Sequence, residues 1–332
     1  MPIFAQAPGK LVILGEYAVL HGGRALVMAV DRHCRVSIDS VDSTHCRLVT
    51  QAPNTQRFSF RLGQNSGSKL IDEIVVSLSE ARAVSGWEAR VDSRAFFGNT
   101  GNKFGIGSSA AVLVAFAGAF GRFVGATTDE LSVNALIELH RSFQGGAGSG
   151  LDVAAAKLGG ITDFRLDDAN RPLFGSVQLP NSVGFAGVFT GTSAATPDFL
   201  RCFDHWRASE SRKAESFLAE MRQTAENGYA AMCANDAGEF LRAVKAYGYQ
   251  LERLGEAFGR EIVTKEHRRI GELAERFDVV YKVSGAGGGD LGLAFSCDTA
   301  ALALFTAAVS AESFECIDLK IDRNGLVIEE QM

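Results

Sequence analysis

The sequence predicts an α+β protein in which strands and helices are grouped rather than strictly alternating. The first third is rich in β-branched and aromatic residues with period-two alternation, which is typical of strands. Long helical patterns follow residue 108, and short strands return after residue 160. This order counts against a Rossmann-type domain, which needs a regular series of strand, helix and strand.

In the first half, each expected element rests on its own pattern. Alternation predicts five short strands, at residues 3–5, 11–14, 35–40, 46–50 and 57–61. An apolar stripe predicts a helix over 68–84, and residues 87–91 add another strand. Helices are expected over 108–124 and 128–143, and a short helix from Asp152 should end at Gly159 and Gly160.

In the second half, strands are expected at residues 161–165, 183–190, 279–283 and 291–295. Residues 208–276 carry three helical patterns, and Asp298 can cap a helix over 299–309. The chain should end in a hairpin of residues 315–321 and 326–329, turned at Asn324-Gly325. A polar segment around 167–180 contains two prolines and predicts two domains, 1–175 and 176–332.

Charge and composition exclude several classes of function. The 332 residues include 33 Lys and Arg against 39 Asp and Glu, a net charge of −6. This balance argues against broad binding of nucleic acid or of an anionic membrane, since both need a basic face. No run of about 18 apolar residues predicts a membrane span, and no signal peptide is apparent, so a cytoplasmic protein is expected. Six cysteines show no metal-binding spacing and are expected to be reduced thiols.

Glycine is concentrated in three segments, and the one before the helix at residue 108 has the clearest chemistry. Its sequence is Gly105-Ile-Gly-Ser-Ser-Ala-Ala111. Glycines allow a ligand to approach the backbone, and the first N–H groups of a helix attract an anion. Ser108 and Ser109 add hydroxyls for a phosphate or Mg²⁺, while an ordinary N-cap is an equally good reading of Ser108. The segment does not match the G-x-x-x-x-G-K-[ST] loop.

The other two glycine segments each contain polar residues. Gly148-Ser-Gly-Leu-Asp152 places a carboxylate at the start of a short helix. Asp152 is either a first-turn acid or the group that orients or deprotonates a substrate hydroxyl. Ser284-Gly-Ala-Gly-Gly-Gly-Asp290 lies between two expected strands. Because each glycine costs backbone entropy on ordering, this loop is expected to press against a ligand or another backbone segment.

Two lysines complete a set of groups suited to phosphoryl transfer. Lys10 follows Ala7-Pro8-Gly9 and opens a strand, and Lys103 lies two residues before Gly105. Either lysine alone would ordinarily be a solvated side chain. Together with an anion seat and a carboxylate, they provide the countercharges that phosphoryl transfer requires.

These segments resemble the three signature motifs of the GHMP kinases. Ala7-Pro-Gly-Lys-Leu-Val-Ile-Leu-Gly-Glu-Tyr-Ala-Val19 and the glycine segments at 105–111 and 284–290 occur in the order of that family. The resemblance implies an N-terminal domain similar to the second domain of ribosomal protein S5 and a C-terminal ferredoxin-like α+β domain. It also implies a small-molecule kinase that uses ATP and Mg²⁺, acts as a monomer or homodimer, and has its site between the domains.

The same resemblance implies roles for individual residues. Asp152 would lie beside the acceptor oxygen, Lys10 would neutralise developing charge there, and Lys103 would bridge the transferred phosphoryl group. Ser109 would contact Mg²⁺. The ATP phosphates would bind at Gly105, Ile106, Gly107, Ser108, Ser109 and Ala110. The acceptor would contact Lys10, Tyr17, Ser149, Asp152, Ser284, Gly285, Ala286 and Gly287.

Within the family, the chain is most similar to the phosphomevalonate kinases. The similarity lies in Gly15-Glu-Tyr-Ala-Val19, Lys103-Phe-Gly-Ile-Gly-Ser-Ser109, Thr190-Gly-Thr-Ser-Ala-Ala-Thr196 and His140-Arg-x-x-Gln-Gly followed by Asp152-Val-Ala-Ala. It implies phosphorylation of 5-phosphomevalonate to diphosphomevalonate in the mevalonate pathway of isoprenoid biosynthesis. An acceptor that carries a phosphate needs local positive charge in a chain of net charge −6, and Lys10, Lys103 and Arg141 are the candidates.

Three alternatives accompany this reading. Residues 20–26 resemble the same region of mevalonate kinases, so mevalonate is an alternative acceptor. A ligand sensor with an inactive GHMP-kinase fold is a second alternative, and the retained Lys10, Ser109 and Asp152 argue against it. A decarboxylase of the same pathway normally lacks the full third glycine motif, which is intact here.

Overall fold

The computed structural model describes residues 1–79, 82, 84–98, 101–146, 148–193 and 196–330. Its larger sheet has the strand order β12-β1-β2-β5-β3-β4, and β6 continues it by pairing with both β2 and β7. The long β2 makes this possible, because residues 25–28 pair with β6 and residues 35–41 pair with β5. The strands are β1 (Ile3–Leu14), β2 (Ala25–Val41), β3 (His45–Gln51), β4 (Thr55–Arg61), β5 (Gly86–Asp92), β6 (Ile161–Leu166), β7 (Pro172–Val177) and β12 (Val327–Glu330).

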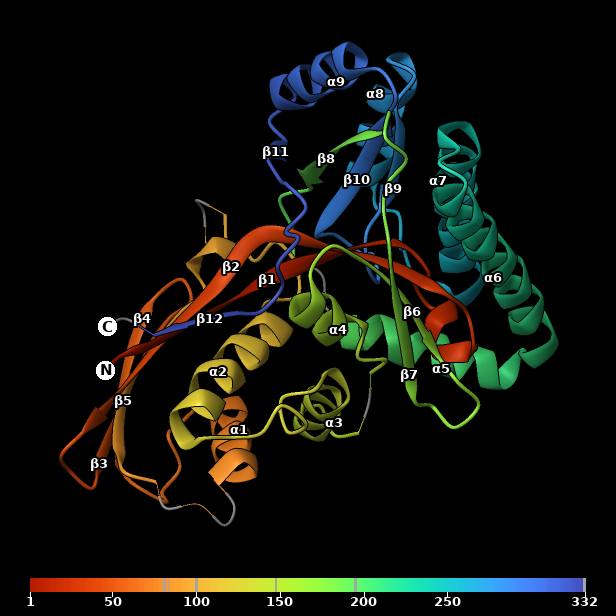
Figure 1. The fold of residues 1–332 in the computed structure, drawn as a ribbon. Coiled ribbons are helices and arrows are strands. Elements are labelled where there is room, and N and C mark those ends of the chain that lie inside the picture. Colours follow the sequence, from red (N-terminus) through yellow and green to blue (C-terminus); the bar gives the residue numbers. More distant parts are fainter. Residues whose placement is uncertain (80–81, 83, 99–100, 147, 194–195, 331–332) are drawn as a thin grey trace.

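Four helices lie below this sheet in Figure 1: α1 (Lys69–Ser79), α2 (Ser108–Val124), α3 (Val133–Phe143) and α4 (Leu151–Leu158). The central one, α2, is apolar on most of its surface because it packs between the sheet and the other three helices. Trp87 of β5 meets Phe116 and Phe120 of α2 edge to face, with ring centroids 6.1 and 6.0 Å apart. Burial of these large side chains holds α2, and with it the glycine segment at its start, in place.

The smaller sheet consists of β8 (Gly184–Phe189), β9 (Val280–Val283), β10 (Leu291–Ser296) and β11 (Glu315–Ile317), in the order β11-β8-β10-β9. All its pairs are antiparallel, and α8 (Lys265–Arg276) and α9 (Thr299–Ala311) pack against it. The order β8-α8-β9-β10-α9-β11 is that of a ferredoxin-like unit. The predicted α+β class and the ferredoxin-like second unit are therefore confirmed.

Three further helices follow β8 along the chain: α5 (Thr196–Ser209), α6 (Ser211–Cys233) and α7 (Ala237–Phe258). Helix α7 packs against β9 of this sheet, and α6 packs against α7 (Figure 1). The side chain of Asp236 caps α7 by accepting a hydrogen bond from the Glu239 N–H at 3.0 Å, and Gly259 ends it in a left-handed conformation. None of the helices in the described ranges is long and apolar enough to cross a membrane.

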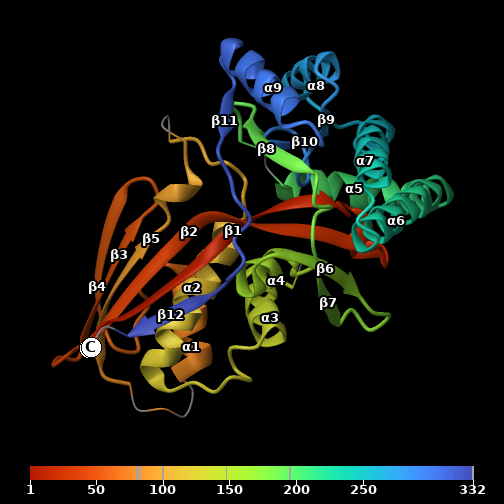
Figure 2. The same cartoon turned by 45° about the horizontal axis from the view of Figure 1, so that its top comes forward.

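Several expected elements need correction. The closing hairpin is wrong, because β11 pairs with β8 whereas β12 pairs with β1 in the other sheet (Figure 2). The Asn324-Gly325 turn is present, but both of its N–H groups are bonded to the carboxylate of Asp322, and the turn redirects the chain between sheets. The predicted second domain, 176–332, thus returns its last strand to the first sheet. Residues 172–177, part of the polar segment expected to mark the domain boundary, form the edge strand β7.

Candidate active site

The first motif lies on β1, directly against the glycine segment 105–111. The backbone N–H of Lys10 donates to the Ile106 carbonyl at 2.9 Å. Gly9 must be glycine here, since a Cβ at that position would come within 2.7 Å of the same carbonyl oxygen. The Lys10 side chain is buried except near its end, and its Nζ lies 3.5 Å from Oδ1 of Asp152 on α4. Two predicted catalytic residues, far apart in sequence, are therefore neighbours.

The glycine segment 105–111 leads into the start of α2. Gly107 occupies the N-cap position with a left-handed conformation (φ 76°), and no side chain caps the first turn. Ser108 is the first helical residue, so its alternative reading as an N-cap is wrong. No acidic residue belongs to the first turn of α2, and its first N–H groups can receive an anion. Ile106 and Ala110 are buried, so they offer a ligand only their backbone.

Three helices bring polar side chains together beside Lys10. Ser109 Oγ of α2 lies 3.2 Å from Nε2 of His140, near the end of α3. Asp152 stands in the first turn of α4. Burial lowers the pKa of His140, an effect that the nearby Asp152 opposes, so the imidazole is neutral near pH 7. His140 was absent from the predicted site, although the His140-Arg141 similarity was a signal for it.

Arg141 holds the second glycine run instead of pointing to an acceptor. Its guanidinium donates to the carbonyls of Gly148 at 3.1 Å and Ser149 at 3.0 Å, and it also pairs with Glu138. The buried Ser149 hydroxyl accepts a hydrogen bond from the Leu151 N–H at 3.3 Å. Arg141 therefore fixes the loop that leads to Asp152, and the positive charge expected from it at the acceptor is already engaged.

The third segment is held from several directions by the protein itself. Ser284 Oγ accepts from the N–H of Val12 at 2.8 Å and donates to the Val12 carbonyl at 3.0 Å, which joins the loop to β1. A side chain at Gly287, where φ is +84°, would overlap with the backbone of Ile262. The expectation that this loop presses against another backbone segment is confirmed at Gly287. By contrast, a Cβ at Gly285 would meet no described atom within 4 Å.

Tyr17 supports this loop. Its hydroxyl donates to the Ala286 carbonyl at 2.6 Å, and its ring packs against Phe203 and Phe258. Burial raises the pKa of Tyr17 well above its ordinary value, so the hydroxyl stays protonated and remains a donor. Contact of Tyr17 with an acceptor stays a prediction, whereas its contact with the third segment is direct.

A buried ion pair behind the third segment was missed from the sequence. Lys282 Nζ of β9 lies 2.5 Å from Oε1 of Glu16, and the same oxygen accepts from the Gly285 N–H at 3.2 Å. Burial lowers the pKa of Lys282, while the adjacent Glu16 opposes this change. A lysine inside the apolar strand Val280–Val283 was the available signal, because a lysine is rarely fully buried without a partner.

Lys103 stands apart from these contacts. It is exposed, its carbonyl accepts a hydrogen bond from Ser193 Oγ at 2.7 Å, and it forms an isolated bridge with Phe97. Its ammonium forms no ion pair within the described ranges. In the neighbouring motif at 190–196, Ala194 and Ala195 lie outside the described residues, while Thr190 Oγ1 donates to the Asp290 carbonyl at 3.1 Å.

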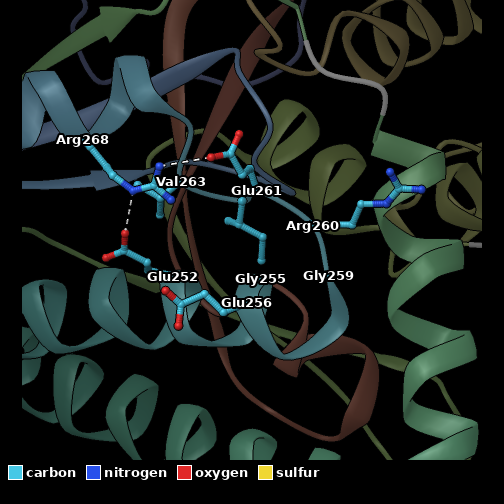
Figure 3. Close-up of a pocket in the computed structure, with 9 residues that line it drawn as sticks. Glu252, Gly255, Glu256, Gly259, Arg260, Glu261, Val263 and Arg268 are labelled. Atoms are coloured by element: carbon cyan, nitrogen blue, oxygen red, sulfur yellow. Dashed lines mark hydrogen bonds and ion pairs between the residues drawn. The ribbon is translucent and has the colours of Figure 1, made fainter.

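The hollow drawn in Figure 3 lies behind the third segment, between the end of α7 and the start of α8. Arg268 spans part of it, bonded to Glu252 at 2.9 Å and to Glu261 at 3.1 Å. None of the predicted catalytic residues lines it. Its connection to the candidate site is Ile262, whose carbonyl accepts from the Gly288 N–H at 2.9 Å.

The side chains around Lys10 also suit a weakly held Mg²⁺. Ser109 offers a hydroxyl oxygen and Asp152 a carboxylate, the kinds of ligand that Mg²⁺ prefers. In the described part of the chain, no cluster of three or more His, Cys, Asp and Glu side chains could hold a metal ion. This donor set fits an ion that is held mainly by nucleotide phosphates and water.

Comparisons with known proteins agree with the geometry. Residues 70–160 match the family model of the GHMP kinases N terminal domain. The chain is 30% identical over 344 residues to the phosphomevalonate kinase of Streptomyces sp. (strain CL190), covering 88% of this chain and 89% of that protein. It is 28% identical over 340 residues to that of Saccharolobus solfataricus, covering 98% and 99%.

A solved structure shares the fold. It is titled as Streptococcus pneumoniae phosphomevalonate kinase in complex with phosphomevalonate and AMPPNP, and it matches with a TM-score of 0.81 and 21% identity. The match covers 96% of this chain and 99% of that one. Similarity along nearly the whole length, joined to the convergence of three glycine motifs on one site, leads to one conclusion: this chain belongs to the GHMP kinase family of phosphotransferases.

Proposed function

We propose that this protein transfers the γ-phosphoryl group of ATP to 5-phosphomevalonate, giving diphosphomevalonate and ADP. The observation that best supports transfer is the Lys10–Asp152 pair, 3.5 Å apart, beside the uncapped start of α2. Two relatives named phosphomevalonate kinases, each similar to most of this chain, support the choice of acceptor.

In the proposed reaction, an oxygen of the acceptor phosphate forms a bond to the γ-phosphorus. The bond from that phosphorus to the β–γ bridging oxygen breaks, and ADP carries away the electron pair. The start of α2 would hold the nucleotide phosphates through its free N–H groups, including those of Ser108 and Ser109. Fixed donors of this kind stabilise charge at the transition state without reorganising during the reaction.

Lys10 and Asp152 would have different roles at the acceptor. The ammonium of Lys10 favours the ionised acceptor phosphate and offsets its repulsion from the γ-phosphate. The Asp152 carboxylate holds that ammonium on the side of α4, so the charge lies where the acceptor oxygen must approach. Since Arg141 is engaged by loop carbonyls, Lys103 is left as the second cation for the transferred group.

Ser109 and Asp152 would hold Mg²⁺ when it arrives with ATP, and the ion would neutralise phosphate charge. His140 bears on this arrangement because its Nε2 lies within hydrogen-bond distance of Ser109 Oγ. A neutral imidazole adds no repulsive charge beside a cation.

Mevalonate is the second candidate acceptor, because residues 20–26 resemble the mevalonate kinases. The structure gives that segment a separate explanation. Arg24 forms ion pairs with Asp163 and Glu226, and it stacks on the Tyr229 ring with its Cζ 3.6 Å from the centroid. These contacts join the residue before β2 to β6 and α6, so packing accounts for Arg24.

The test is ATP turnover measured in parallel with mevalonate and 5-phosphomevalonate, using ADP release as the readout. We expect turnover with 5-phosphomevalonate and little with mevalonate. Asp152→Asn is the matched control, since a contaminating kinase would not respond to it. Ready phosphorylation of mevalonate alone would establish the alternative acceptor, and turnover of neither compound would favour the ligand sensor.

A further inference from the structure

His267 lies buried beneath the far end of the third glycine segment. It belongs to the first turn of α8, and only 1% of its surface is exposed. Its Nε2 is 3.0 Å from the Gly289 carbonyl oxygen, and its Nδ1 is 2.8 Å from the Tyr281 hydroxyl. A carbonyl can only accept, so Nε2 carries the proton and Nδ1 accepts from Tyr281. The two partners therefore determine both the tautomer and the orientation of the ring.

From Gly289 the contact continues into the nucleotide-binding segment. The next residue, Asp290, has a left-handed backbone (φ 59°) and donates its N–H to the Thr192 carbonyl at 2.8 Å. Its side chain occupies the space that a Cβ on Gly105 would need. The peptide held by His267 thus carries the side chain against which the segment before α2 rests.

The beginning of the third segment is bonded to the first motif. Tyr17 bonds to Ala286, Glu16 to Gly285, and the backbone of Val12 to Ser284. From the ferredoxin-like unit, His267 bonds to the Gly289 carbonyl, and Thr190 Oγ1 donates to the carbonyl of the next residue, Asp290, at 3.1 Å. Each end of the loop is therefore held by a different part of the molecule.

His267 performs this task as a neutral group. Burial lowers its pKa to about 4, with Lys282 acting in the same direction and the Gly289 carbonyl and Glu266 opposing it. Tyr281, the other titratable neighbour, stays protonated because its burial raises its pKa. No positive charge is therefore added behind the loop at neutral pH, which indicates a role in geometry rather than in charge.

We propose that His267 is a positioning residue for the phosphoryl-transfer site. With Tyr281 fixing its tautomer, it holds the Gly289 carbonyl and, through Asp290, sets the position of the Gly105–Ser109 segment at the start of α2. The inference rests on the proposed function, because it assigns the segment at Gly105 to the nucleotide.

The test compares His267→Leu with His267→Gln in the full-length protein. Leucine has a similar size but no donor, whereas the glutamine amide can donate to the Gly289 carbonyl. The measurements are the Kd of the ATP analogue AMPPNP with Mg²⁺, by calorimetry without acceptor, and KM and kcat for ATP. We expect His267→Leu to raise Kd and KM about tenfold, the effect of one lost buried hydrogen bond, and His267→Gln to stay within about threefold.

Ile270→Ala is the matched control, because Ile270 lies on the same helix and is fully buried in the smaller core. It should lower the thermal stability while leaving the AMPPNP Kd unchanged. Tyr281→Phe keeps the ring packing and removes only the hydroxyl, so it tests the tautomer if His267→Leu does not fold, with an expected rise in Kd of about threefold.

Wild-type Kd values in both folded His267→Leu and Tyr281→Phe would overturn the proposal. It would also be overturned if glutamine were no better than leucine, or if Ile270→Ala weakened binding equally. These binding data are independent of the acceptor. A wild-type protein that turned over neither acceptor would contradict the proposed function without deciding the role of His267.

Discussion

Two lysine–carboxylate pairs, each with one member in residues 10–16, differ in their exposure and in the distance between their charges. Lys282 and Glu16 are 2.5 Å apart, with side chains 0% and 3% exposed. Lys10 and Asp152 are 3.5 Å apart, with side chains 11% and 36% exposed. Lys10 of β1 pairs with Asp152 of α4, whereas Glu16, just after β1, pairs with Lys282 of β9. One is closed to solvent and short, and the other is open and longer.

This difference in exposure predicts different roles: the buried pair should support the fold, and the open pair should act in the proposed phosphoryl transfer. Glu16 Oε1 already serves Lys282 and the Gly285 N–H, and burial of both side chains keeps a substrate away from the pair. A buried pair of this kind is costly to break, because the remaining charge stays out of water. The open pair can exchange partners, since the Asp152 side chain is 36% exposed to water. We therefore expect substitutions in the first pair to affect folding and those in the second to affect turnover.

The largest effect is expected from breaking the buried pair. Lys282→Met should lower the free energy of unfolding by about 3–5 kcal/mol, because it leaves Glu16 charged and buried. Urea unfolding followed by circular dichroism measures this loss. Adding Glu16→Gln should recover most of it, since the amide oxygen can still accept from the Gly285 N–H. If Lys282→Met alone lowered the free energy of unfolding by less than about 1 kcal/mol, the buried pair would be no more important for stability than an exposed pair.

Lowering the pH should also destabilise the fold through His267, which is buried beneath Gly289 of the third segment. The unfolded chain protonates the His267 imidazole below its ordinary pKa of 6.5, whereas the folded chain protonates it only below about 4. Between these values the unfolded state holds more protons, so stability falls as the pH is lowered. The expected loss is about 3 kcal/mol between pH 6.5 and pH 4. Urea titrations across this range should show the loss in the wild type and its reduction in His267→Gln.

At the open pair, Asp152→Asn should reduce kcat by ~10²-fold or more, the usual effect of removing a positioned acid–base or orienting carboxylate. Its unfolding free energy should change by less than about 1 kcal/mol, because the pair is partly exposed. Initial rates with ATP and 5-phosphomevalonate, read beside a urea curve, give both quantities. Turnover within a few-fold of wild type would make Asp152 a simple first-turn acid.

The smallest effect is expected at Ser109, next to the open pair. Ser109→Ala removes one hydroxyl and should raise the Mg²⁺ concentration for half-maximal rate roughly five- to tenfold, with little change in stability. Rates across a Mg²⁺ titration at constant ATP test this expectation. If neither the Mg²⁺ dependence nor the maximal rate changed, Ser109 would not belong to the site.

The sequence predicted those parts of the fold in which a local pattern and its environment agree. The helix expected over 108–124 has those bounds in α2, and Asp298 caps α9 as expected, accepting from the Ala300 N–H at 2.8 Å. The closing hairpin failed because an Asn-Gly turn says nothing about which sheet each flanking strand joins. Strand β7 was missed because Pro172 and the polar residues around the strand resemble a domain boundary, although an edge strand tolerates a proline at its first residue.

The candidate site shows the same division. Lys10, Ser109 and Asp152 were predicted because glycine segments mark where backbone and ligand can approach each other, and the structure places Lys10 Nζ 3.5 Å from Asp152 Oδ1. His267 gave no such signal, since a lone histidine on an amphipathic helix looks like any other polar residue. Its contact with Gly289 depends on the crossing of α8 over the smaller sheet, and no sequence period encodes that crossing.

The return of β12 to the larger sheet has a consequence for biosynthesis. β1, which carries Lys10, is covered on one side by β2 and on the other by β12, so residues 3–6 await residues 327–330. A ribosome makes some 310 residues between these two strands, and one edge of β1 stays unpaired during that time. Late completion of such a long-range pair slows folding. Chaperone binding during translation should therefore concentrate on the N-terminal strand until the last residues emerge.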